Sequence, residues 1–226
     1  MERLLDKAAR KTTYYSQMKI KDLESAVGTL SKPSKMPCYS FSIPAKRCIT
    51  GMKLRNVKGS ICSSCYALKG RYVFDNVQNA LEDRFQKLRH SNWVRLMAQL
   101  IAKKEKSGYF RWHDSGDLQS VVHLHKICEV AKMLPNIQFW LPTREFSIVS
   151  KYMELHHIPD NLTIRLSGLM FDGHPPLGIA KRLGLTTSGA STVKDFSCPS
   201  SKQGGKCLDC RACWDKSVQN INYKKH

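Results

Sequence analysis

Four cysteines near the C-terminus have the spacing of a metal site. Cys207, Cys210 and Cys213 are separated by two residues each, and Cys198, which is followed by proline, lies upstream. Two-residue gaps let successive thiolates converge, and a glycine pair at 204–205 would turn the chain back toward Cys198. Such a run with a remote Cys-Pro is typical of ferredoxin-type ligation, whereas structural zinc usually takes two separated cysteine pairs. We expect a [4Fe-4S] cluster here, with zinc as the alternative.

A second cysteine set lies in the first third of the chain. Cys62 and Cys65 form another C-x2-C pair, with Cys48 and Cys38 upstream. If only Cys48, Cys62 and Cys65 bind a four-iron cluster, one iron stays open to a small molecule, whereas a fourth ligand from Cys38 would close the site. We favour three ligands. The alternative is that Cys38 and Cys48 are ordinary core residues, as we expect for Cys128.

Basic residues surround this second set and dominate the whole chain. The net charge is +19, and residues 1–75 hold 15 basic and 5 acidic residues, a net of +10. Such a field attracts polyanions, so we expect nucleic acid or a nucleotide as the partner; a solubilising surface or binding to anionic lipid are the alternatives. The residues expected to hold phosphate groups are Lys46, Arg47, Lys53, Arg55, Lys58, Lys69 and Arg71.

The nine cysteines are expected to be reduced thiols of a cytosolic protein. Disulfide-dense scaffolds are usually short and secreted, whereas this chain has 226 residues and no apolar stretch followed by a small-residue cleavage site. No apolar run approaches the length of a membrane span. We therefore expect a soluble, cytoplasmic protein.

Strands and helices alternate along the middle of the chain. Apolar residues at helical spacing predict two helices within 76–104, separated at Ser91-Asn92. The elements expected after them are strands over 109–113, 137–141 and 162–166, and helices over 118–133 and 146–155. This alternation predicts an α/β fold with parallel strands, as a partial or atypical (β/α) barrel or an open sheet.

The pattern divides the chain into three parts. We expect a basic N-terminal arm over 1–36, an α/β domain over 37–190 and a cysteine-rich metal-binding extension over 191–226. Within the domain, a short strand over 38–43 leads into a long irregular segment over 45–72. Loops of that length are uncommon unless they are functional, so this one is the expected cluster loop.

Polar residues follow three of the expected strands, at the edge where parallel sheets place their working residues. The first strand leads into His113-Asp114-Ser115-Gly116-Asp117. His113 and Asp114 could perform acid–base chemistry, and Asp117 could hold an ammonium group or a ribose hydroxyl, unless it merely caps the next helix. The next two strands end near Thr143-Arg144 and Arg165-Leu166-Ser167, so we expect three polar strand ends to converge.

This order of features resembles that of radical S-adenosylmethionine enzymes. In that family three cysteines follow a strand, and the next strand ends in a turn that binds the methionine amino group. The resemblance implies cluster ligands at Cys48, Cys62 and Cys65, and an auxiliary cluster at the C-terminal cysteines. The residues implied to contact S-adenosylmethionine are Tyr66, Ser115, Gly116, Asp117, Thr143, Arg144, Arg165 and Ser167. The chain departs from the family's C-x3-C-x2-C run, because 13 residues separate Cys48 from Cys62.

A closer resemblance is to the bacteriophage gene product 88 family. It is carried by Ser-Ile-Pro-Ala at 42–45, a cysteine, aromatic and alanine step at 65–67, the segment 111–117 and the terminal Cys-x2-Cys-x2-Cys-Trp. The resemblance spans about residues 38–214. It implies a phage or prophage origin, and so the cytoplasm of a bacterial host, and brings no activity with it.

Three functions are compatible with these features. The first is a radical S-adenosylmethionine-like iron–sulfur enzyme that acts on nucleic acid or a nucleotide and takes electrons from a donor protein. The second is a non-enzymatic iron–sulfur or zinc protein that binds nucleic acid, with an architectural metal. The third is a nuclease that uses His113, Asp114 and Asp117 with a divalent cation. We favour the first.

Overall fold

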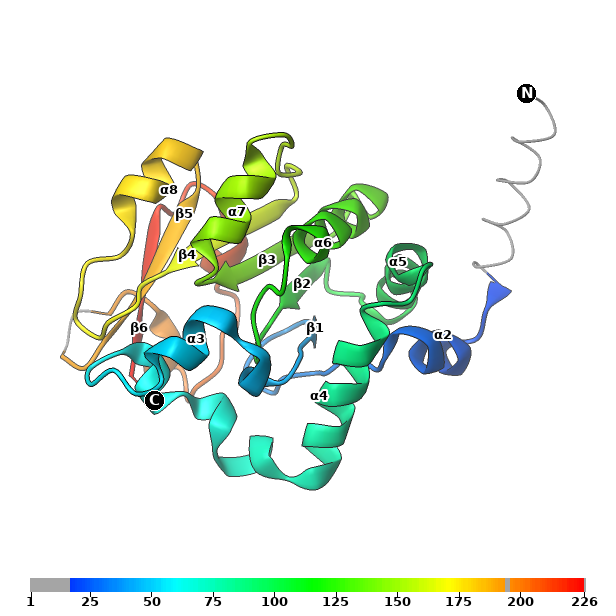
Figure 1. Ribbon diagram of the computed structural model, residues 1–226, viewed down its shortest axis with the longest axis horizontal. Coiled ribbons are helices and arrows are strands. Elements are labelled where there is room, and N and C mark those ends of the chain that lie inside the picture. Colours follow the sequence, from blue (N-terminus) through cyan, green and yellow to red (C-terminus); the bar gives the residue numbers. More distant parts are fainter. Residues whose placement is uncertain (1–16, 194–195, 226) are drawn as a thin grey trace.

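The computed structural model describes residues 17–193 and 196–225, and its centre is a parallel sheet. Six strands lie side by side in chain order, and every neighbouring pair is parallel (Figure 1). The strands are β1 (Tyr39–Phe41), β2 (Tyr109–Trp112), β3 (Gln138–Thr143), β4 (Leu162–Ser167), β5 (Thr186–Ser191) and β6 (Asn220–Lys224). The sheet is not closed, since β1 and β6 form its two edges. The expected α/β fold with parallel strands is confirmed.

Helices connect most of the strands. Three lie between β1 and β2, and one lies in each of the next three connections. The helices are α2 (Ile20–Val27), α3 (Ile49–Leu54), α4 (Asp75–Lys87), α5 (Trp93–Lys104), α6 (Val121–Met133), α7 (Phe146–Met153) and α8 (Leu177–Leu183). In Figure 1, α5 to α8 form a row along one side of the sheet, whereas α3 lies at the arrowhead end of β3. The expected division of 76–104 into two helices is confirmed.

The core lies between this row of helices and one face of the sheet. Alternate residues of β2, Phe110 and Trp112, point into it and meet Phe139 of β3. Trp93 of α5 packs against Trp112 from the helix side, with ring centroids 6.0 Å apart. All four aromatic side chains are fully buried. Their burial contributes much of the hydrophobic stabilisation that holds the helices on the sheet.

The connection from β5 to β6 covers the opposite face of the sheet and holds the four C-terminal cysteines. Trp214 packs edge-on against Trp140 of β3, and its indole N–H donates to the Phe110 carbonyl at 2.9 Å. After this connection the chain returns to the sheet as β6, which pairs with β5 along five residues. The cysteine-rich segment is therefore a connection between two neighbouring strands of the sheet.

The segment expected to be irregular over 45–72 contains more regular structure than the sequence suggested. It includes α3 and the short 3-10 helices η1 (Ala45–Arg47), η2 (Ile61–Ser64), η3 (Tyr66–Leu68) and most of η4 (Gly70–Val73). These elements are short, and few of their side chains are buried, so their apolar residues do not recur at helical spacing. Periodicity therefore could not reveal them.

The expected N-terminal arm is part of the fold from α2 onward, while residues 1–16 lie outside the described residues. Leu23 and Val27 of α2 are fully buried and belong to the same core as α5. No helix among the described residues is long and apolar enough to cross a membrane.

Candidate functional site

Three cysteines of the first set gather beyond the carboxyl end of β1. Cys48 immediately precedes α3, Cys62 lies in η2 and Cys65 follows it. The three thiols lie within electrostatic range of one another. Ser60 fixes the loop between them, because its hydroxyl accepts from the Ser63 amide and donates to the Leu54 carbonyl. We call Cys48, Cys62 and Cys65 the three-thiol group.

Gly51 leaves room beside this group. A Cβ atom at this position would lie 2.9 Å from the Cβ of Cys48 and 3.6 Å from the Sγ atoms of both Cys48 and Cys62. Those two sulfurs are therefore no farther apart than twice that distance. A side chain at position 51 would therefore approach both sulfurs and press against the Cβ of Cys48.

Two carboxylates lie close to the three-thiol group. Glu145, just after β3, accepts hydrogen bonds from the amide and the hydroxyl of Thr50 at 2.7 and 2.8 Å, which ties α3 to the sheet edge. Burial, together with the charge of Asp117 and the neighbouring thiols, raises the pKa of Cys48. Burial also raises the pKa of Cys62, although Arg144 opposes it. Binding of a metal there would therefore have to displace protons from thiols.

Asp117 joins the ends of β2 and β3. Its carboxylate accepts from the Thr143 hydroxyl at 2.6 Å, the Arg144 amide at 2.9 Å and the Leu118 amide at 2.8 Å. Burial raises the pKa of Asp117 to about 6 despite these hydrogen bonds. It does not cap α6, because Ser120 does so by accepting from the His123 amide. Asp117, Thr143 and Arg144 thus converge as the sequence predicted.

The turn before Asp117 needs a glycine. Gly116 has φ +80°, and a Cβ there would lie 2.7 Å from the Ile43 carbonyl oxygen. The Ser115 hydroxyl donates to that same oxygen at 3.1 Å, so both residues fasten the turn to the segment after β1. Ser115 and Gly116 therefore hold the strand ends together, and their contact with a cofactor stays a prediction.

His113 and Asp114 have different surroundings. The ring of His113 is buried against His123, neither ring nitrogen has a hydrogen-bond partner among the described residues, and burial holds its pKa well below the usual value. Asp114 instead accepts hydrogen bonds from Ser42 and, at 2.7 Å, from the Tyr72 hydroxyl. Tyr66, next to Cys65, donates to the Asp114 backbone carbonyl. Of the two residues, Asp114 is the one connected to the three-thiol group.

The side chain of Arg165 binds mainly to the backbone of the C-terminal segment. Its five N–H groups donate to backbone carbonyls at 2.7 to 3.2 Å, four of them in the β5–β6 connection. A guanidinium has five donors, so none remains for a cofactor. The Ser167 hydroxyl shares a hydrogen bond of 3.1 Å with that of Ser188, and its contact with a cofactor stays a prediction. The contact with S-adenosylmethionine expected for Arg165 is replaced by this anchoring role.

The four C-terminal cysteines also lie near one another on the sheet face that Arg165 occupies. Cys207 is within electrostatic range of Cys198 and Cys210, and Cys213 is within range of Cys198. Burial raises the pKa of Cys213 to about 11, while a hydrogen bond from Tyr223 at 3.3 Å opposes the shift. We call these residues the four-thiol group.

Cys38 lies beside the four-thiol group. It is buried beside Trp140 and Trp214, and Cys207 lies within electrostatic range of it. The sequence had offered Cys38 as a fourth ligand of the other set, which the structure does not favour. Cys128 is fully buried in α6, as expected. All nine cysteines are free thiols.

The thiols are grouped without forming a single-ion site. Within residues 17–193 and 196–225, no three His, Cys, Asp or Glu side chains are placed to hold a metal ion. A tetrahedral zinc site with Zn–S bonds of about 2.3 Å brings its sulfurs to about 3.8 Å from one another. The iron–sulfur cluster and the zinc alternative expected at these cysteines therefore stay predictions.

Comparison with known protein families shows to which family the chain belongs. The model of the family described as gene product 88 matches residues 4–216, which is nearly the whole length. The chain belongs to the gene product 88 family. No curated protein and no solved structure matches it. The family expected from the sequence is thus confirmed, whereas nothing links this gene product 88 protein to radical S-adenosylmethionine enzymes.

The basic residues of this gene product 88 chain lie as expected on the surface. All seven of those selected between 46 and 71 are exposed. Arg47 forms an ion pair with Glu82 at 2.7 Å, which leaves it less available for phosphate. Whether this surface binds nucleic acid stays a prediction.

Sequence reasoning missed three residues of this sheet edge. Glu145 belongs to the strand end that drew attention to Thr143 and Arg144, but its partner Thr50 is 95 residues away. Tyr72 and Arg84 lie beside Asp114 and Ser42 in a pocket, although no motif joins them. Their only signal in the sequence was membership of a basic, aromatic region after the cysteine pair.

Proposed function

We propose that this protein is an iron–sulfur enzyme of radical S-adenosylmethionine type, which acts on a nucleotide or nucleic acid in the cytoplasm of a bacterial host. The observation that carries the proposal is the three-thiol group at the carboxyl ends of β1 to β3. Three thiols can hold a four-iron cluster and leave one iron without a protein ligand. When bound and reduced, such a cluster supplies an electron to S-adenosylmethionine at the open iron.

The surroundings of the three-thiol group support a bound cosubstrate. The open sheet, with strands in chain order, offers its carboxyl edge as a partial barrel would, and ligands of parallel sheets bind there. Asp117 and Glu145 supply negative charge beside the thiols and suit the amino group of S-adenosylmethionine. Gly51 keeps the space next to two of the sulfurs free.

The four-thiol group is proposed to hold a second cluster with all positions filled by protein. Its anchoring by Arg165 and Trp214 suits a centre that keeps a fixed geometry. Arg111 lies within electrostatic range of Tyr66 and Asp114 on one side and of Cys213 on the other. In this proposal an electron from a donor protein enters at the four-thiol group and passes to the three-thiol group.

The test is anaerobic purification of the full chain followed by iron, sulfide and zinc analysis. We expect about eight irons and eight sulfides per chain, from two four-iron clusters. Cys62→Ser should remove about half of the iron, and so should Cys210→Ser. Cys128→Ala should remove none, because this buried cysteine belongs to neither group.

The enzymatic part of the proposal needs its own measurement. Reduction of the wild-type protein in the presence of S-adenosylmethionine should yield 5′-deoxyadenosine, and Cys62→Ser should abolish the yield. Stoichiometric zinc without sulfide would overturn the proposal. Full iron content without 5′-deoxyadenosine would instead favour a non-enzymatic protein that binds nucleic acid through its exposed basic residues.

A further inference from the structure

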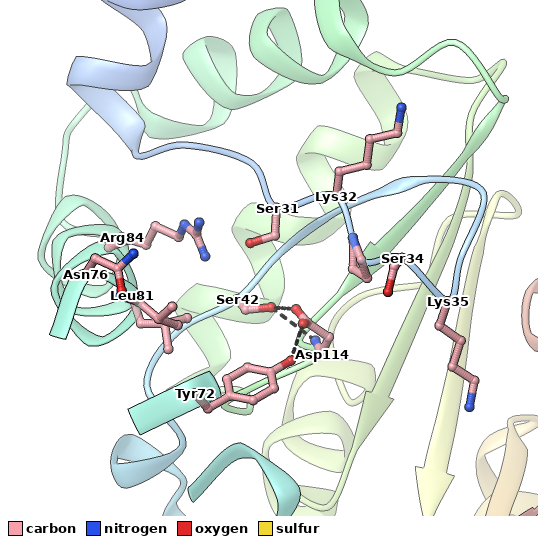
Figure 2. A pocket seen from close by; sticks show the side chains of 13 residues that line it. Ser31, Lys32, Ser34, Lys35, Ser42, Tyr72, Asn76, Leu81, Arg84 and Asp114 are labelled. Carbon is pink, nitrogen blue, oxygen red and sulfur yellow. Dashed lines mark hydrogen bonds between the residues drawn. The ribbon is translucent and has the colours of Figure 1, made fainter. Parts of the chain in front are cut away.

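A pocket of about 500 Å³ lies beside Asp114 and is lined by none of the cysteines. It opens between the loop 31–35, the residue after β1 and the start of α4 (Figure 2). Asp114 lines this pocket and connects it to the thiols, because its backbone carbonyl accepts a hydrogen bond from Tyr66, the neighbour of Cys65. The volume falls within the range of small-molecule sites.

Arg84 places a buried positive charge on one wall of the pocket. Its side chain is packed on Gly28 and only 5% of the residue is exposed. One guanidinium nitrogen donates to the Thr29 hydroxyl at 3.1 Å, whereas Nε has no partner among the described residues. Asp114 and Asp83 lie within electrostatic range of it, but no acidic side chain among the described residues is close enough to form an ion pair with it. Figure 2 shows the guanidinium directed from α4 toward Ser31.

A buried guanidinium without an ion-pair partner is costly, which indicates that an anion completes it. The loop across the pocket adds positive charge at longer range, because it carries Lys32 and Lys35, whose side chains point away from Arg84 in Figure 2. Hydroxyl groups of Ser31 and Ser34 are available there as further donors. Arginine and serine donors in one pocket are typical of phosphate recognition.

The other end of the pocket has the opposite character. The carboxylate of Asp114 accepts from Ser40 at 3.1 Å, from Ser42 and from Tyr72. A carboxylate offers about four acceptor positions, so one remains for a ligand. Leu81 adds an apolar wall between the two ends. The ligand should therefore have an anionic group at one end, a hydroxyl or amine at the other and a flat apolar surface between them.

We propose that this pocket binds a nucleoside monophosphate, either free or as the phosphate-bearing end of a strand, with its phosphate on Arg84 and a ribose hydroxyl on Asp114. That this ligand is the substrate rests on the proposed function, whereas its binding does not. Tyr66, the neighbour of Cys65, donates a hydrogen bond to the backbone of Asp114, which links the pocket to the three-thiol group.

The test is calorimetric titration of the full chain, as purified, with AMP, UMP, adenosine and inorganic phosphate. Moderate salt suppresses binding to the general positive charge of the surface. We expect AMP and UMP to bind at one site, and adenosine and phosphate each to bind at least about tenfold more weakly. A 5′-phosphorylated oligothymidylate, compared with its dephosphorylated form, distinguishes a strand end from a free nucleotide.

Arg84→Met is the decisive variant, because it keeps the aliphatic contact with Gly28 and removes the charge. It should weaken AMP binding at least about tenfold without lowering the melting temperature of the free protein, since a buried cation that lacks an ion-pair partner is removed. Arg182→Met, which alters an exposed arginine of α8, should leave AMP binding within about twofold. Should Arg84→Met not fold, the surface variant Lys32→Ala/Lys35→Ala should weaken AMP binding severalfold.

Several outcomes would overturn the proposal. They are AMP affinity unchanged by Arg84→Met or, if that variant does not fold, by Lys32→Ala/Lys35→Ala, adenosine binding as tightly as AMP, and phosphate binding as tightly as AMP. Failure of the proposed function is distinguishable, because Cys62→Ser should lose 5′-deoxyadenosine formation and still bind AMP at this pocket.

Discussion

The two cysteine groups differ in what surrounds them. The three-thiol group lies near the carboxylates of Asp117 and Glu145, and Gly51 leaves no side chain beside two of its sulfurs. The four-thiol group lies on a face of the sheet where Arg165 makes five hydrogen bonds to backbone carbonyls. Thiol count alone therefore does not separate a reactive centre from a structural one. The neighbours of the thiols decide which group can admit a ligand.

The largest effect is expected from Arg165→Met, which tests whether the four-thiol group depends on its anchor. The change leaves buried carbonyls of the β5–β6 connection and of Thr187 without donors. We expect the free energy of unfolding in urea to fall by about 4 kcal/mol or more. Arg182→Met, at an exposed site, should change it by less than about 0.5 kcal/mol. A similar loss of the free energy of unfolding in both variants would contradict the anchoring role of Arg165.

The second effect concerns the turn that joins the strand ends beside the three-thiol group. Gly116→Ala introduces a Cβ at φ +80° against the Ile43 carbonyl, so we expect a loss of about 3 kcal/mol in urea unfolding. Gly70→Ala is the matched control, because Gly70 also has positive φ but a Cβ there would meet nothing within 4 Å. It should lose only about 1 kcal/mol. Equal losses would show that steric contact with Ile43 is unimportant.

A third effect depends on pH. The pKa of Asp117 is about 6 in the folded protein, above its usual value of 3.8, so the folded state binds the extra proton between these values. Stability contributed by this residue is therefore greatest below about pH 4 and is lost as pH rises through about 6, by about 3 kcal/mol. The free energy of unfolding should be measured against pH for metal-free wild-type protein and for metal-free Asp117→Asn. The difference between the two profiles should show this slope. A flat difference between about pH 4 and 7 would contradict it.

Gly51→Ala is expected to change stability the least and to affect the iron of the three-thiol group alone. The added methyl group enters the space beside Cys48 and Cys62, so about half of the iron should be lost. The helix preference of alanine only partly offsets the close approach of 2.9 Å to the Cβ of Cys48, so the free energy of unfolding should fall by about 1 kcal/mol. Gly178→Ala, whose methyl group would meet nothing within 4 Å, should keep all of the iron. Full iron in Gly51→Ala would show that the space is not needed.

Much of the fold could be predicted because its central strands are apolar and alternate with helices. β4 is buried at every position, and α6 begins at a serine cap, so both produce clear patterns. The strands β5 and β6 escaped prediction, since Thr186–Ser191 and Asn220–Lys224 are polar and lack the apolar alternation of a half-buried strand. Pairing with neighbouring strands, which no local pattern records, makes them part of the sheet.

The candidate site was predictable in its cysteines and only partly in their neighbours. Spacing identified both thiol groups, and strand ends identified Asp117 and Thr143. The role of Arg165 could not be predicted, because its partners lie 22 to 53 residues later in the chain. The burial of Arg84 could not be predicted for a related reason, because it depends on the packing of α4 against Gly28.

The most direct test of an open iron at the three-thiol group is electron paramagnetic resonance of the reduced protein, with and without S-adenosylmethionine. Cys210→Ser retains only the three-thiol group, and its spectrum should change when S-adenosylmethionine is added, because the open iron gains a ligand. Cys62→Ser retains only the four-thiol group, and its spectrum should stay the same. A spectrum of Cys210→Ser that does not respond, or an equal response in both variants, would contradict an open iron at the three-thiol group.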